Sequence, residues 1–184
     1  MQEVNYIYLS LSSSIDNQII SKMFSRILKD YKYELDFVDN IIVLSLSGGN
    51  KSLSILQSSL QAMGEDVNSH FKGLICPCFN DNFQKYLKFV KDDKFLYLFE
   101  ISQMHKDLFS DNINMLDGID EYTLESVKCY IEMGNSPTLA AYKLFVHRNT
   151  ITYRVDKFVQ DLRIDLSSFP NCVFVYGLIS AKLN

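Results

Sequence analysis

Residues 136–162 read SPTLAAYKLFVHRNTITYRVDKFVQDL, and this stretch organises the C-terminal part of the chain. Ser136 is a favourable helix N-cap, and Pro137 suits the first helical position, where a backbone N–H needs no partner. Apolar residues recur every three or four positions on both sides of a short break at Phe145 and Val146. The pattern therefore predicts two helices joined by a tight turn.

The second predicted helix has one apolar face. Its inward positions are Ile151, Val155, Phe158, Val159 and Leu162. Small Ala141 lets the first helix approach the second closely, and Val146 is expected to pack between them. This layout is that of a helix-turn-helix, whose second helix enters the DNA major groove by its N-terminal end. The spacing alone fits equally well an ordinary helical hairpin on a protein surface.

The opposite face of this helix carries side chains that suit contact with DNA. They are His147, Arg148, Asn149, Thr152, Tyr153 and Lys157. Arginine pairs bidentately with guanine and asparagine with adenine, while threonine and tyrosine reach phosphates. Residues 137–163 hold five Lys/Arg against two Asp in a chain of net charge −4, which favours an anionic partner for this stretch. Phe145 stands in the turn where many such motifs have glycine, which reaches positive φ easily.

The run TLAAYKLFVHRNTITYRV resembles the C-terminal helix-turn-helix of the PucR/CdaR family of bacterial transcriptional regulators. The preceding TLESVKCYIEMGN and the following IDLSSFP are similar as well, so the resemblance covers residues 105–184. In that family LFVHRNT-x-x-YR is the signature, and Phe145 is normal in the turn. The resemblance implies double-stranded DNA as the partner. It implies contact with DNA through His147, Arg148, Asn149, Thr150, Tyr153 and Arg154. Family members usually carry a further N-terminal sensory domain, so the chain is expected to be a short form or a C-terminal piece.

Length and composition fit one globular domain or two small ones. The 184 residues are 47% apolar and 22% charged, which is ordinary for a globular protein. The sequence has no targeting leader and no apolar run near 18 residues, so we expect a soluble, cytoplasmic protein without a membrane partner. Residues 1–120 carry a net charge of −5 and residues 121–184 a net charge of +1. Nucleic-acid contact is therefore expected from the C-terminal part.

The first hundred residues alternate between strand-like and helix-like patterns. Strands are predicted over 4–11, 33–37, 41–47, 74–79 and 95–101, and helices over 15–31, 51–64 and 82–90. Val38, Asp39 and Asn40 form a hairpin turn between the second and third strands, and Pro77 places the fourth at a sheet edge. The order β-α-β-β-α-β-α-β predicts an α+β fold whose sheet, antiparallel or mixed, is ferredoxin-like and covered by helices.

This order is similar to that of the degenerate GGDEF-like domain that precedes the helix-turn-helix in CdaR-type regulators. A diguanylate cyclase needs a Gly-Gly-Asp/Glu-Glu-Phe motif at the central hairpin, but the hairpin here reads FVDNI. A lone Asp39 in such a place is turn chemistry, so cyclase activity is not expected. No histidine has a catalytic partner at a recognisable spacing, and the pair Cys76 and Cys78 has no second pair at zinc-finger spacing. We expect no catalytic residues, no metal and no cofactor.

The predicted domains are a GGDEF-like α/β domain over residues 1–103, a linker over 104–119 and a helix-turn-helix domain over 120–184. A helix over 123–133, ended by Gly134, is expected to pack behind the hairpin. The last helix, over 170–183, is apolar almost all round and must be buried. Either a second copy of the chain or the N-terminal half could cover it, and the first possibility predicts a homodimer or higher homo-oligomer.

The leading hypothesis is a sequence-specific DNA-binding transcriptional regulator that is not an enzyme. One alternative is a nucleotide or metabolite sensor, or another signalling module, that uses residues 1–103 and an effector of unknown identity. Another is a protein-interaction module whose helical hairpin binds protein.

Overall fold

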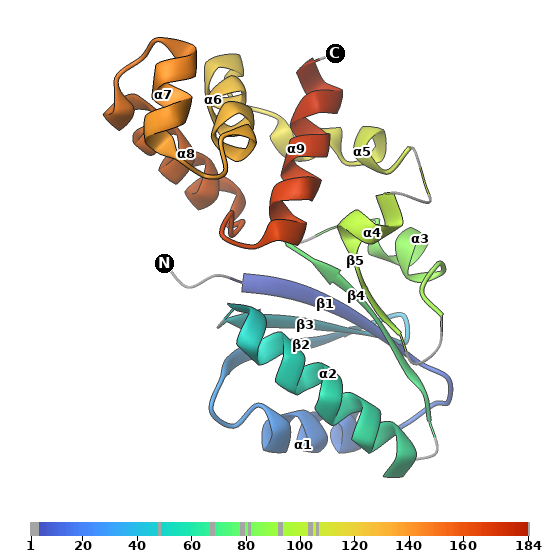
Figure 1. The fold of residues 1–184 in the computed structure, drawn as a ribbon. Coiled ribbons are helices and arrows are strands. Elements are labelled where there is room, and N and C mark those ends of the chain that lie inside the picture. Colours follow the sequence, from blue (N-terminus) through green and yellow to red (C-terminus); the bar gives the residue numbers. More distant parts are fainter. Residues whose placement is uncertain are drawn as a thin grey trace. The chain divides into compact units, whose positions relative to one another are not determined.

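The computed structural model describes residues 4–47, 49–66, 69–77, 80, 82–91, 94–102, 105 and 107–183. The chain divides into two compact units, Gln2–Ile101 and Ser102–Asn184. The strands labelled in Figure 1 belong to the first unit, and the described part of the second is helical. The predicted α+β class is confirmed.

The N-terminal unit is built on a five-stranded sheet with the strand order β2-β3-β1-β4-β5. The strands are β1 (Val4–Leu11), β2 (Lys32–Val38), β3 (Ile41–Ser47), β4 (Phe71–Cys76) and β5 (Phe95–Tyr97). The first four pair antiparallel, whereas β5 runs parallel to β4. Helix α1 (Asn17–Ile27) joins β1 to β2, and α2 (Gly49–Asp66) joins β3 to β4. The predicted ferredoxin-like arrangement is therefore confirmed, with one parallel strand added.

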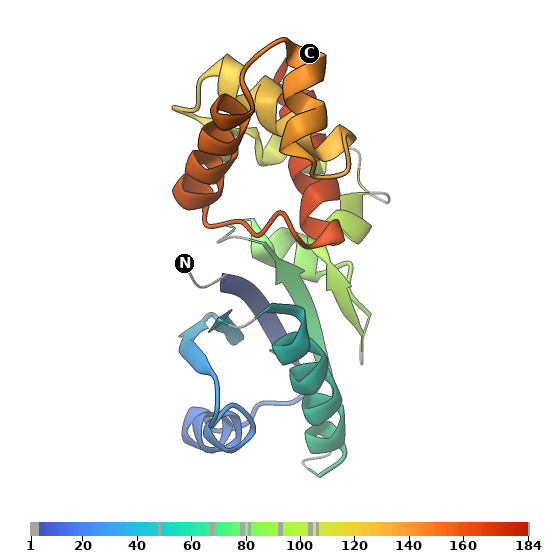
Figure 2. The same cartoon turned by 60° about the vertical axis from the view of Figure 1, so that its left-hand side comes forward.

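Helices α1 and α2 lie on the same face of the sheet, as Figures 1 and 2 show. Because side chains alternate along a strand, Ile7 and Leu9 point to this face and Tyr8 to the other. The core between the helices and the sheet consists of Ile7, Leu9, Ile20, Phe24, Leu28, Ile42, Leu44, Leu46, Leu56, Leu60, Phe71 and Ile75. On the opposite face, the ring of Tyr8 stacks on Phe83 of α3 (Phe83–Leu87), with ring centroids 4.3 Å apart.

Two predicted strands differ from the structure. β4 pairs with both β1 and β5, so it is not an edge strand. It ends at Cys76, which leaves Pro77 outside the ladder, where its missing N–H does no harm. The last strand ends at Tyr97 and helix α4 (Leu98–Ser102) follows, because the Glu100 carboxylate accepts the Tyr97 N–H at 2.7 Å and caps the new helix.

The turn between β2 and β3 is formed by Asp39 and Asn40, whereas Val38, predicted as part of the turn, ends β2 and pairs with Ile41. The φ angles of Asp39 and Asn40 are 49° and 65°, the left-handed values that a two-residue turn requires. Aspartate and asparagine tolerate this conformation better than most residues, which explains their presence here.

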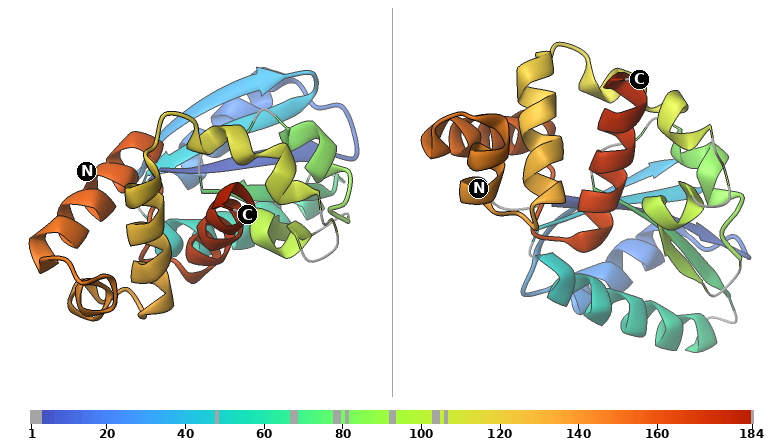
Figure 3. Two further views of the ribbon diagram at one scale, coloured as in Figure 1. Left: turned by 90° about the horizontal axis from the view of Figure 1, so that it is seen from above. Right: turned by 45° about the horizontal axis from the view of Figure 1, so that its top comes forward.

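The C-terminal unit consists of short pieces and longer helices. They are α5 (Leu108–Asp111), the 3₁₀ turn η1 (Ile113–Leu116), α6 (Glu121–Glu132), α7 (Pro137–Leu144), α8 (Arg148–Leu162) and α9 (Phe169–Leu183). Helix α9 packs against α6, α5 and η1, and Figure 3 shows α6 and α9 side by side. None of the helices that the structure describes is long and apolar enough to cross a membrane.

Part of the apolar surface of α9 is covered by α5 and η1 of the same unit. Phe174 and Leu178 are completely buried there. Gly177 leaves room for the ring of Phe109, since a Cβ at this position would lie 2.2 Å from a ring carbon. α5 and η1, which provide this cover, fall within residues 104–119, the segment predicted as a linker. Phe169 at the start of α9 stays 72% exposed, so cover of this side by a second copy or by the N-terminal half remains a prediction.

Candidate nucleic-acid interface

Helices α7 and α8 pack against each other and against α6. The buried residues of α8 are Ile151, Val155 and Phe158, on the face that the sequence predicted. Ala140 and Ala141 of α7 are also buried, and their small side chains allow the close approach of the helices. The opposite face of α8 is consequently fixed in its outward orientation.

The turn between α7 and α8 is closed by backbone hydrogen bonds at the end of α7. The Val146 N–H donates to the Ala141 carbonyl at 3.1 Å, the six-to-one bond of a Schellman motif. This motif places its penultimate residue in the left-handed region, and that residue is Phe145, with φ 54° and ψ 40°. For a residue with a bulky side chain, the left-handed conformation costs about 1–2 kcal/mol.

The end of α6 has the same motif with glycine in that place. The Asn135 N–H donates to the Tyr130 carbonyl at 2.9 Å, and Gly134 takes the left-handed conformation with φ 62°. A Cβ on Gly134 would have no heavy atom within 4 Å, so packing does not demand glycine there. The two helix ends thus differ in the residue type at one matched position.

The N-terminus of α8 is capped by His147. Its Nδ1 accepts the Asn149 N–H at 3.2 Å. Because Nδ1 is the acceptor, the ring proton of a neutral His147 lies on Nε2, which can donate outward. Two features of this helix end therefore suit an anion: the Nε2 donor and the positive end of the helix dipole.

Most of the predicted contact residues lie on the exposed face of α8. Exposed are His147, Arg148, Asn149, Thr152, Tyr153 and Lys157, and Thr150 is half-buried. Within the described parts of the chain, Arg148 and Lys157 have no hydrogen-bonded or ion-paired side-chain partner. Arg148 and Lys157 are nine residues apart and so project from opposite sides of α8, and the exposed amide of Asn149 lies between them around the helix. We call the six exposed residues the α8 face.

Arg154 points to a different place. Its Nη1 donates to the Ser126 Oγ at 2.9 Å and to the Tyr122 carbonyl at 3.4 Å, both on α6. Its guanidinium also lies 5.7 Å from the centre of the Tyr122 ring, within the range of a cation–π contact. The structure therefore separates Arg154 from the α8 face and joins it to α6.

Other charges near α7 and α6 are already paired. Lys143 Nζ lies 2.7 Å from Glu132 Oε2, and this hydrogen bond lowers the pKa of Glu132 and raises that of Lys143. Asp120 caps α6, and its carboxylate accepts both the hydroxyl and the backbone N–H of Thr123. These hydrogen bonds lower the pKa of Asp120. Lys143 is accordingly a weaker candidate for phosphate contact than Lys157.

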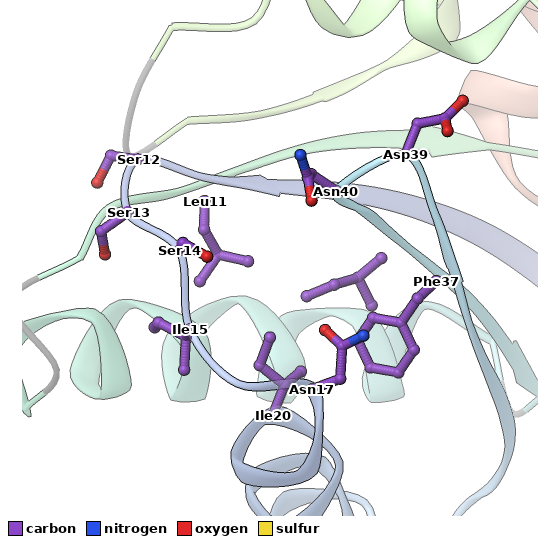
Figure 4. A pocket seen from close by; sticks show the side chains of 11 residues that line it. Leu11, Ser12, Ser13, Ser14, Ile15, Asn17, Ile20, Phe37, Asp39 and Asn40 are labelled. Carbon is purple, nitrogen blue, oxygen red and sulfur yellow. The ribbon is translucent and has the colours of Figure 1, made fainter.

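The N-terminal unit has a hollow of about 410 Å³ beside the hairpin turn. It lies between the loop that follows β1 and the turn that follows β2, as Figure 4 shows. Its lining residues are Leu11, Ser12, Ser13, Ser14, Ile15, Asn17, Ile20, Phe37, Asp39, Asn40 and Ile42. In Figure 4 the Asp39 carboxylate points away from the hollow, and Gln84 Nε2 donates to it at 3.2 Å. The hollow thus presents mainly hydroxyl, amide and apolar groups.

The cysteines of the described residues are buried. Burial raises the pKa of the Cys129 and Cys172 thiols, which disfavours the nucleophilic thiolate form. Cys76 is buried as well, and Cys78 of the Cys76/Cys78 pair lies outside the described residues. Across the described residues, no group of three or more His, Cys, Asp or Glu side chains could hold a metal ion.

Sequence reasoning did not find the partners of Arg154. Tyr122 and Ser126 are four residues apart on α6 and therefore share a helix face. That spacing was available in the sequence, but nothing in it indicated which residue of α8 would face them. The relation became visible only from the packing of α6 against α8.

Comparison with known proteins identifies the C-terminal part of the chain. The PucR C-terminal helix-turn-helix domain matches residues 123–176. An uncharacterized protein of Bacillus subtilis (strain 168), YxkF, is 33% identical over 82 residues, which are 45% of this chain and 28% of that protein.

A solved structure, a regulator of polyketide synthase expression from Bifidobacterium adolescentis, aligns with a TM-score of 0.46 and 13% identity. It covers 100% of this chain and 81% of that chain. The helices that carry the α8 face all lie within the matched residues 123–176. The chain therefore contains, at residues 123–176, the C-terminal helix-turn-helix domain of the PucR family.

Proposed function

We propose that this protein is a sequence-specific transcriptional regulator of PucR/CdaR type that binds double-stranded DNA through the α8 face and is not an enzyme. The observation that carries the proposal is that Arg148 and Asn149, neighbours in the sequence, are both exposed at the N-terminal end of α8. That end of a recognition helix enters the major groove, where arginine reads guanine and asparagine reads adenine.

The remaining members of the α8 face take supporting roles. His147, Thr152 and Tyr153 offer donors to phosphate oxygens, and Lys157 contributes charge along the backbone. Thr150, half-buried beside them, remains within the proposed contact region. Arg154 is proposed to hold α8 against α6 instead of touching DNA, given its hydrogen bonds to that helix.

Two copies of the chain are expected to act together on DNA. One recognition helix reads only a few base pairs, and its positive stretch belongs to a chain of net charge −4. Two copies one helical turn apart would double the contacts. We also propose that the N-terminal unit is a degenerate GGDEF-like domain. The protein is proposed to be cytoplasmic.

Selection of bound duplexes from a random DNA pool tests the function. The selected site then serves to compare variants: Arg148→Ala and Asn149→Ala should each lose about 1–3 kcal/mol and relax the choice at one base pair. Lys157→Ala should weaken all sequences alike and reduce the salt dependence. No enrichment of any sequence, or equal sequence-blind losses from all three variants, would contradict the proposal.

A sensor function of the N-terminal unit is the second candidate, and the hollow beside Asp39 and Asn40 favours it. Such a function is compatible with DNA binding, because the two would use different units. Calorimetric titration of the full chain with nucleotides tests it. Heat that disappears in an Asn40→Ala variant but persists in Arg148→Ala would support the sensor.

A further inference from the structure

The side chain of Phe145 has no packing role that explains its position. It is 93% exposed, so its ring contributes almost nothing to the core. It also occupies the left-handed position of the motif that ends α7, where glycine avoids strain. At the matched position after α6 the chain has Gly134. Phe145 therefore strains the fold without a compensating contact inside it.

Neighbouring residues also present an apolar surface next to the α8 face. Tyr142, three residues before Phe145, is 82% exposed. Phe145 itself lies two residues before His147, the N-cap of α8. The exposed ring thus adjoins the helix end that the proposed function places in the major groove.

We propose that the Phe145 ring packs against the apolar surface of the DNA that α8 reads, formed by thymine methyl groups and deoxyribose. Apolar contact with a thymine methyl is an established form of base recognition for phenylalanine. Arg148, the first residue of α8 and three residues after Phe145, supplies positive charge beside the turn and attracts the duplex to this end of the helix. The inference rests on the proposed function and adds a contact residue outside α8.

The decisive variant is Phe145→Gly, because the proposal expects opposite effects on folding and on binding. The melting temperature of the C-terminal unit should rise by about 2–5 °C, since glycine adopts positive φ without strain. Affinity for a duplex selected from a random pool should fall about tenfold, the loss of one well-packed apolar contact. The slope of affinity against salt should stay that of the wild type, because no charge is removed.

Phe145→Asn and Phe145→Leu are the matched controls. Asparagine tolerates the left-handed region but is polar, so it should lose binding as glycine does. Leucine is apolar, so it should bind within about threefold of the wild type. Wild-type affinity in Phe145→Gly would overturn the inference, and so would a lower melting temperature.

If Phe145→Gly changed the sedimentation coefficient of the protein and left its DNA affinity unchanged, the inference would also be overturned, because Phe145 would then contact another protein molecule. Failure of this inference is distinguishable from failure of the proposed function. In the first case the wild type still binds its selected duplex and Arg148→Ala still loses affinity. In the second case neither the wild type nor Arg148→Ala binds a selected duplex.

Discussion

The two units are stabilised by contacts that differ in how far apart along the chain the contacting residues lie. In the N-terminal unit, β1 pairs with β4 across a long stretch of chain, so that Tyr6 lies opposite Cys76. In the C-terminal unit, α6, α7 and α8 follow one another along the chain and pack together. A surface made by one helix is therefore continuous in sequence, whereas a surface made by the sheet collects residues from distant loops.

This difference explains why the sequence supports a functional proposal for the C-terminal unit and none for the N-terminal unit. The α8 face belongs to a single run of residues, 147–157, and its chemistry can be read as a motif. The hollow of the N-terminal unit combines Ser12–Ser14 with Asp39 and Asn40, from two separate turns. Such a site leaves no local pattern in a sequence. The comparison predicts that the two units also respond separately to mutation.

Phe158→Ala should have the largest effect. Phe158 is completely buried in the C-terminal unit, and removing such a ring costs about 3–5 kcal/mol. Hydrogen exchange followed by mass spectrometry should show faster exchange in α6, α7 and α8 and unchanged exchange in β1 to β4. Phe24→Ala, in the N-terminal core, is the matched control and should show the reverse pattern. Loss of protection in both units from either variant would break the comparison.

Arg154→Ala should reduce the stability of the C-terminal unit by about 1–2 kcal/mol, because it removes a charged hydrogen bond to Ser126. DNA affinity should fall for all sequences alike, while the salt dependence keeps its slope. Measurements are thermal unfolding and DNA titration at several salt concentrations.

Two further variants sharpen this prediction. Ser126→Ala should reproduce part of the loss, and the double variant should lose less than the sum, since both changes remove the same bond. Lys157→Ala should instead leave stability unchanged and reduce the salt slope by about 0.9. An unchanged melting temperature with a shallower slope in Arg154→Ala would place this arginine on a phosphate.

Asp120→Ala should cost about 1 kcal/mol near neutral pH, the usual value of a helix cap. The pKa of Asp120 is lowered in the folded state by its hydrogen bonds to Thr123. Its contribution is therefore present above the pKa of the unfolded chain and is lost as the pH falls through the folded-state value. The stability gap between wild type and variant should thus close below about pH 4. A gap that stays constant from pH 7 to pH 3 would argue against the carboxylate as its origin.

The last prediction is that the protein has no cyclase activity. The full chain, incubated with GTP and magnesium or manganese, should form no cyclic dinucleotide, because the central hairpin contains Asp39 and Asn40 without the motif of a cyclase. Chromatography of the reaction mixture measures the product. Turnover that Asp39→Ala abolishes would make the N-terminal unit an enzyme and remove the contrast with the C-terminal unit.

The sequence predicted the elements well where local chemistry determines them. The turn at Asp39 and Asn40, the cap at Ser136 and the end of α6 at Gly134 all follow from residue types with strong local preferences. The inward face of α8 followed from its spacing. The early end of β5 did not, because the capping role of Glu100 competes with a strand-like pattern in the same residues.

Long-range packing was the part that sequence reasoning could not supply. Arg154 and Arg148 are six positions apart on α8, so they project from different sides of the helix, but only the packing of α6 decides which groups Arg154 meets. The cover of α9 was missed for the same reason. Phe109 and the residues around it form short helical turns without a repeating apolar pattern. Their role in covering α9 is visible only from the contact between the Phe109 ring and Gly177.

The packing of α5 and η1 on α9 has a consequence for how this protein can be cut. The matched family domain begins at residue 123, but the compact unit begins at Ser102. A chain shortened to residues 120–184 would keep the recognition helix and lose the ring of Phe109 from the groove at Gly177. The side of α9 exposed by the cut would then associate with other apolar surfaces, including the same side of α9 in a second copy of the fragment. Self-association observed in such a fragment would therefore reflect where it was cut and would say little about the native assembly.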